Sequence, residues 1–172
     1  EMTPIGINSN IPAAILSNSI QIGGPTSTVF LQAVDGGLDL VAIAGASVMS
    51  PTSNGNITAF VRNGITIKEP KDFADKTLGV WFFGNEYQFL RWMSQLGLAP
   101  AGRAGGVTGL TQGVNVDPLL QKQAACISTM TYNEYWQVID AGITPEQLAN
   151  FNYTTEGVAT LEDGLYVLED KR

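Results

Sequence analysis

The sequence predicts an α/β fold with a largely parallel sheet. Short helix signals alternate with short apolar strand signals along the 172 residues, and no repeat or low-complexity segment interrupts them. The segment "LDLVAIAG" at 38–45 is apolar apart from Asp39, which is typical of a strand that is covered on both faces. With 44% hydrophobic and 15% charged residues, the chain can bury a sizeable core. We therefore expect one or two compact globular units.

The first 45 residues predict two helices and two strands. Asn10 followed by Pro12 in the first helical turn introduces a helix through "AAILS". A second helix in "PTSTVFLQAVDGG" has hydroxyl residues in front and a glycine pair behind. The strands are "SIQIGG" at 19–24, which ends in glycines, and the apolar segment at 38–45.

The middle of the chain predicts a change of domain. A surface loop at 46–56, rich in Ser, Thr, Asn and Gly, precedes a strand at 57–63. Pro70 and a capping Asp72 then introduce a short helix, and "TLGVWFF" at 77–83 is the next strand. We place the crossing near residues 65–69. The expected domains are a partial first lobe at 1–66, a second lobe at 67–156, and a segment at 157–172 that returns to the first lobe.

The second lobe repeats the alternation of helices and strands. In "NEYQFLRWMSQLGL", Phe89, Met93 and Leu96 share one helical face, and Asn85 and Gln88 have capping-box spacing. The remaining expected elements are a short strand around 107–110, a helix capped by Asp117 with Pro118 at its first position, a strand "ACISTMT", a helix "YNEYWQVIDAGI", a strand "NFNYTT" and a strand that begins in "DGLYVLEDKR".

The composition excludes several classes of function. The chain has no His, so it lacks imidazole catalysis, a Ser-His triad and histidine metal sites. The net charge is −7 with nine Lys and Arg and no basic run, which argues against a nucleic-acid partner. Cys126 is the single cysteine and lies in the apolar run "QAACIS", which favours a small buried hydrophobe over a reactive thiol. We find no nucleotide fingerprint, no metal-ligand spacing and no membrane-spanning run.

Three places share one arrangement, in which a strand ends, small or polar residues follow, and a helix begins. They are "GGPTSTVF", "WFFGNEYQ" and "STMTYNEYW". In open α/β sheets, ligands bind outside the carboxyl ends of the strands, where helix N-termini present unpaired N–H groups. Three such turns from two units can enclose one small solute.

The aromatic run "WFF" predicts a stacking surface beside the second of these turns. Strand alternation turns Phe82 into the core and places Trp81 and Phe83 together on the opposite face. Gly84 lets a ligand approach the backbone. Glu86 either complements the helix dipole or accepts hydrogen bonds from an amine or ring N–H. A carboxylate in the cleft would also discriminate against anions such as nitrate or sulfonate.

The polar residues at the other two turns are open to two interpretations, helix capping and ligand contact. Both apply to Thr26, Ser27 and Thr28, and again to Thr129, Thr131, Tyr132, Asn133 and Glu134. We expect Tyr135 and Trp136, which follow on the helix, to belong to the core.

At this level of detail the sequence resembles a known family. The segments "SIQIGGPTSTVFLQAVDGGLDLVAIAGAS", "ITIKEPKDFADKTLGV", "GNEYQFLRWMSQLGL" and "TMTYNEYWQVIDAG" resemble the ABC-transporter solute-binding proteins of the nitrate/sulfonate/taurine and thiamine-pyrimidine-synthase-like group. The segments "GVWFFGNE" and "NVDPLLQKQAACISTMTYNEYW" are most similar to the thiamine-pyrimidine-synthase-like branch. The resemblance implies a type II periplasmic-binding-protein fold, with two lobes that close on a ligand.

The resemblance also implies where the ligand binds and how the lobes are joined. The crossovers would be "TIKEP" and "GVATLEDGLYV", and residues 45–47 would form the loop after the first-lobe strand. The expected ligand-binding residues are Thr26, Ser27, Thr28, Ser47, Trp81, Phe83, Gly84, Asn85, Glu86, Thr129, Thr131 and Tyr132. Members of the group are longer at both ends, so we expect the first lobe to be incomplete and the chain to be a fragment.

The function that the resemblance implies is capture of a solute for an ABC importer. The expected solute is a small heteroaromatic amine-bearing molecule, a pyrimidine or thiamine precursor, held between the lobes without cofactor, metal or covalent chemistry. The partners would be membrane permease subunits, and the location periplasmic or membrane-anchored and extracytoplasmic. Alternatives are a taurine, sulfonate or nitrate solute, the effector lobe of a LysR-type regulator, and a pyrimidine-synthase-like enzyme. The enzyme uses a His and a cysteine-rich iron site, which this sequence lacks.

Overall fold

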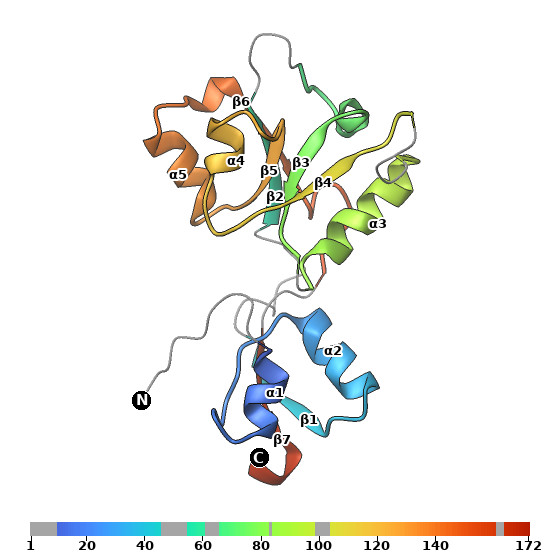
Figure 1. Ribbon diagram of the computed structural model, residues 1–172, viewed down its shortest axis with the longest axis vertical. Helices are drawn as coiled ribbons and strands as arrows, with labels where there is room; N and C mark the ends of the chain where they lie inside the picture. The colour runs from blue at the N-terminus through green and yellow to red at the C-terminus, as the bar shows by residue number, and fades with distance from the viewer. Residues whose placement is uncertain (1–9, 46–54, 61–65, 83, 99–103, 161–163) are drawn as a thin grey trace. The chain divides into compact units, whose positions relative to one another are not determined.

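The chain folds into two compact units. The computed structural model describes residues 10–45, 55–60, 66–82, 84–98, 104–160 and 164–172. Unit 1 combines residues 1–51 with 160–172, and unit 2 consists of residues 52–159 (Figure 1). The chain therefore leaves unit 1, builds the whole of unit 2, and returns. The sequence predicts the same order of segments, with the first change of unit at 66/67 and the second at 156/157.

The described residues of unit 1 form two α-helices and one pair of strands. Its elements are α1 (Ile11–Leu16), α2 (Ser27–Asp35), β1 (Leu40–Gly45), β7 (Gly164–Leu168) and the final 3-10 turn η3 (Glu169–Lys171). The predicted caps are present, since Asn10 Oδ1 accepts from the Ala13 N–H at 3.0 Å and Thr26 Oγ1 from the Val29 N–H at 3.4 Å. The ring of Phe30 on α2 stacks on Tyr166 of β7 at 4.2 Å between centroids.

Two strand predictions in unit 1 are wrong in detail. The segment at 19–24 makes a single antiparallel bridge, from Gly23 to Tyr166, instead of a strand. Pro25 has no N–H to donate, which limits the extension of this pairing on the C-terminal side of Gly23. β1 pairs antiparallel with β7 and is not covered on both faces, because the side chain of Ile43 is 45% exposed within the described structure.

Unit 2 contains a five-stranded mixed sheet with the order β4-β3-β5-β2-β6. The strands are β2 (Gly55–Phe60), β3 (Thr77–Val80), β4 (Thr108–Thr111), β5 (Cys126–Met130) and β6 (Leu148–Asn152). β3 is parallel to β4 and β5, whereas β2 is antiparallel to β5 and β6. The pairing is less parallel than the sequence predicts because β2, expected in the first lobe, lies inside this sheet and runs against both neighbours.

Helices cover both faces of this sheet (Figure 1). α3 (Glu86–Leu96) lies on one face, and α4 (Asp117–Leu120) and α5 (Glu134–Asp140) lie on the other. Two 3-10 turns, η1 (Pro70–Phe73) and η2 (Pro145–Gln147), complete the unit. Phe89 and Met93 are buried and Leu96 packs against the same cluster, so the predicted apolar face of α3 is confirmed.

The core on the α3 side is built around Trp92. Its ring contacts Phe73 at 5.4 Å and Tyr153 at 5.9 Å between centroids, both nearly perpendicular. Cys126 is fully buried in the same cluster, which confirms its interpretation as a small hydrophobe. Trp136 on α5 is 56% exposed, so its expected place in the core is wrong. Glu134 and Val138, four residues apart, face the sheet, and Trp136 lies between them on another side of the helix.

Three of the helix starts in unit 2 differ from the predicted caps. Glu69, not Asp72, precedes η1, and Asp72 reaches back to accept from the N–H groups of Lys68 at 2.8 Å and Glu69 at 3.1 Å. These backbone hydrogen bonds lower the pKa of the Asp72 carboxyl. Asn85 makes no side-chain cap, and Asp117 is the first residue of α4 rather than its cap. Within the described residues, no helix has the length and apolarity to cross a membrane.

The aromatic core of unit 2 predicts a large stability effect at Phe73. Phe73→Ala removes a fully buried ring that contacts Trp92 and Phe151. We expect the free energy of unfolding of unit 2 to fall by about 3–5 kcal/mol. Urea denaturation followed by tryptophan fluorescence measures this loss. The control Val114→Ala, at an exposed side chain, should stay within about 0.5 kcal/mol. Equal effects of the two changes would contradict this account of the core.

Candidate functional site

The parallel part of the unit 2 sheet brings three chain turns to one edge. β3, β4 and β5 run in the same direction, so their carboxyl ends lie side by side. The turns that follow are residues 81–86 after β3, 112–117 after β4 and 131–134 after β5. We call this the carboxyl edge of unit 2. Two of the predicted site turns therefore lie next to each other, joined by a third turn that the sequence prediction did not include.

Trp81 is held at the carboxyl edge by a hydrogen bond. β3 ends at Val80, earlier than predicted, so strand alternation does not decide where the following rings point. The indole Nε1–H of Trp81 donates to the Gly113 carbonyl at 3.0 Å. Its ring is half-buried. Phe83, the predicted second ring of the stacking surface, lies outside the described residues.

The side chain of Gln112 links the turn that holds Trp81 to strand β5. Its Nε2 donates to the Ser128 carbonyl at 2.8 Å and its Oε1 accepts from the Ser128 N–H at 2.9 Å. The side-chain amide thus makes the two hydrogen bonds to Ser128 of β5 that the backbone of a neighbouring strand would make. It does so next to the end of β3 at Val80. Nε2 also approaches the Asn115 carbonyl at 3.3 Å. Gln112 therefore ties the turn that holds Trp81 to the centre of the sheet.

The turn before α3 is closed by its own carboxylate. Gly84 has a φ of 103°, a conformation that favours glycine. Its N–H donates to Glu86 Oε2 at 2.7 Å. One such bond leaves the carboxylate with further acceptor capacity. Asn85 and Glu86 are both half-buried, and the predicted capping box with Gln88 does not form at Asn85.

The turn before α5 also carries a carboxylate, which is buried. Glu134 is only 3% exposed. Its Oε2 accepts from the Met130 N–H at 3.0 Å and its Oε1 from Asn133 Nδ2 at 2.9 Å. Thr131 and Tyr132 are exposed beside it, with Tyr132 at 66%. The Glu134 charge therefore lies where a helix N-terminus would otherwise face an incoming anion.

Thr129 lies inside the sheet instead of on this surface. It is fully buried, and its hydroxyl is 2.7 Å from Thr58 Oγ1, which in turn donates to Asn150 Oδ1 at 2.8 Å. The chain of side-chain bonds joins β5, β2 and β6. Thr129 was expected at the ligand because it precedes a helix, but the strand continues through it to Met130.

Thr26, Ser27 and Thr28, the predicted ligand residues of unit 1, make side-chain hydrogen bonds within that unit. Thr26 caps α2 and its Oγ1 is 3.0 Å from Thr28 Oγ1. Ser27 is buried, with its Oγ 3.1 Å from the Tyr166 hydroxyl. The capping interpretation therefore holds for Thr26. Ser47 lies outside the described residues.

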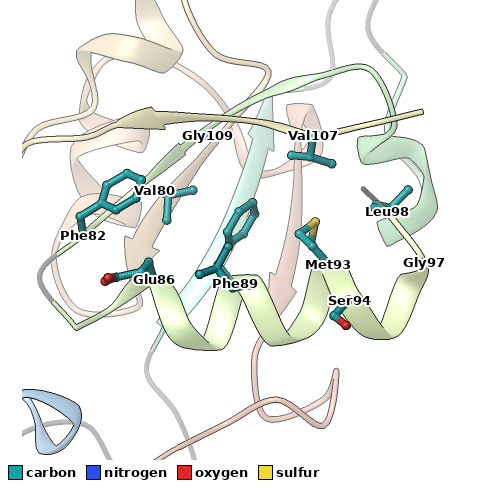
Figure 2. Close-up of a pocket in the computed structure, with 11 residues that line it drawn as sticks. Val80, Phe82, Glu86, Phe89, Met93, Ser94, Gly97, Leu98, Val107 and Gly109 are labelled. Atoms are coloured by element: carbon teal, nitrogen blue, oxygen red, sulfur yellow. The ribbon is translucent and has the colours of Figure 1, made fainter. Parts of the chain in front are cut away.

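A pocket opens along α3 on the same side as the Glu86 turn (Figure 2). Its volume is about 520 Å³, within the range of small-molecule sites. We call it the α3 pocket, and its lining residues are Val80, Phe82, Glu86, Phe89, Leu90, Met93, Ser94, Gly97, Leu98, Val107 and Gly109. Phe82 and Glu86 lie at one end, and Gly97 and Leu98 lie at the other.

Phe82 corrects a prediction. The sequence places it in the core by strand alternation, whereas its side chain is 36% exposed and lines the α3 pocket. The strand has already ended at Val80, so the alternation does not reach it. Gln112, Gly113 and Phe82 are the site residues that the sequence prediction missed. A polar residue directly after the short strand at 108–111 was the available signal for Gln112.

The described residues offer no metal site. Among them, no group of three or more His, Cys, Asp or Glu side chains is placed to hold a metal ion. The carboxyl edge instead combines an anchored indole, exposed aromatic side chains and two carboxylates that are partly satisfied by backbone N–H groups. Such a surface can hold a flat, hydrogen-bonding solute without reacting with it.

The sequence matches one protein family along nearly its whole length. The profile of the NMT1/THI5 like family aligns with residues 3–172. No curated protein matches the sequence.

Solved structures of binding proteins share the fold. The periplasmic aliphatic sulphonate binding protein SsuA from Escherichia coli is 14% identical with a TM-score of 0.69, over 92% of this chain and 48% of that one. The alkanesulfonate-binding SsuA from Xanthomonas axonopodis pv. citri, bound to MOPS, is 14% identical with a TM-score of 0.61, over 92% and 51%. PhnD1 from Prochlorococcus marinus, in complex with methylphosphonate, is 9% identical with a TM-score of 0.59, over 93% and 61%. The chain thus spans about half the length of the two SsuA proteins, and the α/β, type II periplasmic-binding-protein fold is confirmed.

The Gln112 contacts predict that the position of Trp81 depends on that residue. Gln112→Ala removes the side-chain amide that bonds the Ser128 N–H and carbonyl. We expect a loss of about 1–3 kcal/mol in unfolding free energy and a shift of the Trp81 indole N–H resonance in ¹H–¹⁵N NMR spectra. The control Gln121→Ala, at an exposed glutamine, should leave both unchanged. An unshifted Trp81 resonance in folded Gln112→Ala would contradict the anchoring role.

Proposed function

Because this chain belongs to the NMT1/THI5 like family, we propose that it acts as the solute-binding component of an ABC importer. Its solute is a small heteroaromatic molecule that bears an amine, such as a pyrimidine or thiamine precursor. The observation that carries this choice is that the turn at 81–86 carries both the anchored Trp81 indole and the Glu86 carboxylate. The indole offers a flat stacking face, and the carboxylate accepts hydrogen bonds from an amine or ring N–H.

The charges of the carboxyl edge favour this solute over an anion. Glu86 lies at the start of α3 and Glu134 at the start of α5, so both helix starts already hold a carboxylate. The whole chain has a net charge of −7. A sulfonate or nitrate placed here would face two negative groups and would have to displace their hydrogen bonds to Gly84 and Met130. An amine is not repelled by these carboxylates and can bind without displacing their hydrogen bonds.

Binding without chemistry fits the residues present. The family also includes a pyrimidine synthase, but such an enzyme needs acid-base or metal-ligating groups, and this chain has no His and one buried Cys. We propose that the chain captures its solute outside the cytoplasm and delivers it to a membrane permease. Support comes from the fold it shares with proteins described as periplasmic or as ligand-binding components of import systems.

The stacking role of Trp81 can be measured on the full-length protein. Isothermal titration with 4-aminopyrimidine should show binding that Trp81→Ala weakens by about 1–3 kcal/mol, because the ring contact is lost. Trp81→Phe keeps an aromatic face without the indole N–H and should retain part of the affinity. Trp136→Ala removes an exposed ring on α5 and serves as the matched control. Unchanged affinity in Trp81→Ala would count against stacking.

The role of Glu86 can be separated from that of Trp81 by changing its charge alone. Glu86→Gln keeps the side-chain shape and should weaken 4-aminopyrimidine by about 1.5–3 kcal/mol, the range for a hydrogen bond to a charged group. A thermal-shift panel of pyrimidines, thiamine, taurine and nitrate tests the solute class on the unmodified protein. Stabilisation by taurine or nitrate alone would overturn the proposed amine. In that case Glu86→Gln should strengthen binding of the anion.

A further inference from the structure

We propose that the α3 pocket binds the apolar part of the amine-bearing solute, so that the protein accepts amines with an alkyl or aryl extension. This inference rests on the proposed function and extends it from the carboxyl edge into unit 2. The pocket lies entirely within unit 2, between α3 and strand β4, as Figure 2 shows. Nothing in the family comparison assigns it a ligand.

The walls of the pocket are suited to an apolar group. Phe89, Met93, Val80 and Val107 are almost fully buried and form its inner surface. Among the lining residues, Glu86 and Ser94 are the ones with polar side chains. An alkyl or aryl group in the pocket would leave water for a mostly apolar surface.

The charge at the rim determines which end of the solute enters. Glu86 lies at the end of the pocket nearest the carboxyl edge, beside Phe82 (Figure 2). Its Oε2 already accepts one hydrogen bond from Gly84, and the carboxylate retains acceptor capacity for an ammonium group. The apolar part therefore enters along α3 while the cation stays at Glu86. A fatty acid of the same length would place like charges together.

The absence of a side chain at Gly109 on β4 leaves space in the α3 pocket. A Cβ built at this position meets a single neighbour within 4 Å, the Phe82 Cζ at 3.9 Å. The backbone of Gly109 does not require glycine, since its φ is not in the left-handed region. Any larger side chain here would occupy the pocket. Met93 on the opposite wall has a flexible, polarisable side chain that adapts to ligands of different shape.

The test uses the full-length protein, ¹³C-methyl-labelled at methionine, and a series of butylamine, hexylamine and octylamine. Of the chain's four methionines, the structure describes Met93 and Met130, and of these two Met93 lines the pocket. Met93→Leu assigns its resonance. We expect the Met93 methyl to shift on titration and the affinity to rise about threefold to fourfold per added methylene. Hexanoate, with the opposite charge, should bind at least tenfold more weakly than hexylamine.

Two variants on one strand locate the site. Gly109→Val fills the pocket and should abolish the dependence of affinity on chain length. Thr108→Val lies on the other face of β4, with an exposed side chain, and should leave the dependence intact. An unshifted Met93 methyl in the presence of octylamine would overturn the proposal. The methyl would also stay unshifted if another part of the full-length protein covered the pocket, and that result overturns the proposal as well. Equal binding of hexanoate and hexylamine would also overturn it.

The same spectra separate this inference from the proposed function. The indole N–H of Trp81 reports the carboxyl edge, and the Met93 methyl reports the pocket. A Trp81 shift with 4-aminopyrimidine, together with an unshifted Met93 methyl for all three amines, overturns the pocket and leaves the function standing. Stabilisation by taurine or nitrate alone, with no Trp81 shift, overturns the function.

Discussion

The parallel pairing of β3 with β4 and β5 is the constraint on which the rest of the structure depends. It brings the carboxyl ends of three strands to one edge. The residues that follow these strands therefore lie close enough to bond one another. At Gly79 a Cβ would lie 2.9 Å from Gln112 Oε1 and 3.0 Å from Ile127 Cγ2. Glycine at this position is therefore what lets the Gln112 amide lie against β3 and reach Ser128. Once Gln112 bonds β5, the chain leaves β3 at Val80, and Trp81 is free to reach the Gly113 carbonyl.

Acidic side chains close three of the helix starts in unit 2. Asp72 accepts from backbone N–H groups ahead of η1, Glu86 does so ahead of α3, and Glu134 does so ahead of α5. The N–H groups that donate belong to Lys68, Gly84 and Met130, which precede the helix starts. The chemical consequence differs from that of an open helix N-terminus, which attracts anions. In this chain a carboxylate already lies at each of those positions.

Local patterns predicted the elements well and the side-chain roles less well. Periodicity and caps located α1, α2, α3 and most strands, because apolar spacing and capping residues act within a few positions. One error comes from the point at which β3 stops. Phe82 was assigned to the core by continuing the alternation past Val80, and pairing across strands, which ends β3 there, is not a local property of the sequence. The bonds of Gln112 and of Thr129 link strands 16 and 71 residues apart in the sequence, so no short window contains both partners.

The exposed rings at the carboxyl edge are not a consequence of a small core. Unit 2 already buries Phe73, Trp92, Phe151 and Tyr153 in one cluster on the α3 side of the sheet. Phe82 is 36% exposed, so burying the rest of its side chain would stabilise the unit by roughly 0.5–1 kcal/mol, about a third of the value for a fully exposed ring. The sequence instead places Gly109 opposite that ring, where any larger residue would cover it, and glycine within a strand costs about 0.5–1 kcal/mol relative to alanine. Both choices lower stability and keep apolar surface open beside Glu86, which is the arrangement expected where a ligand completes the packing.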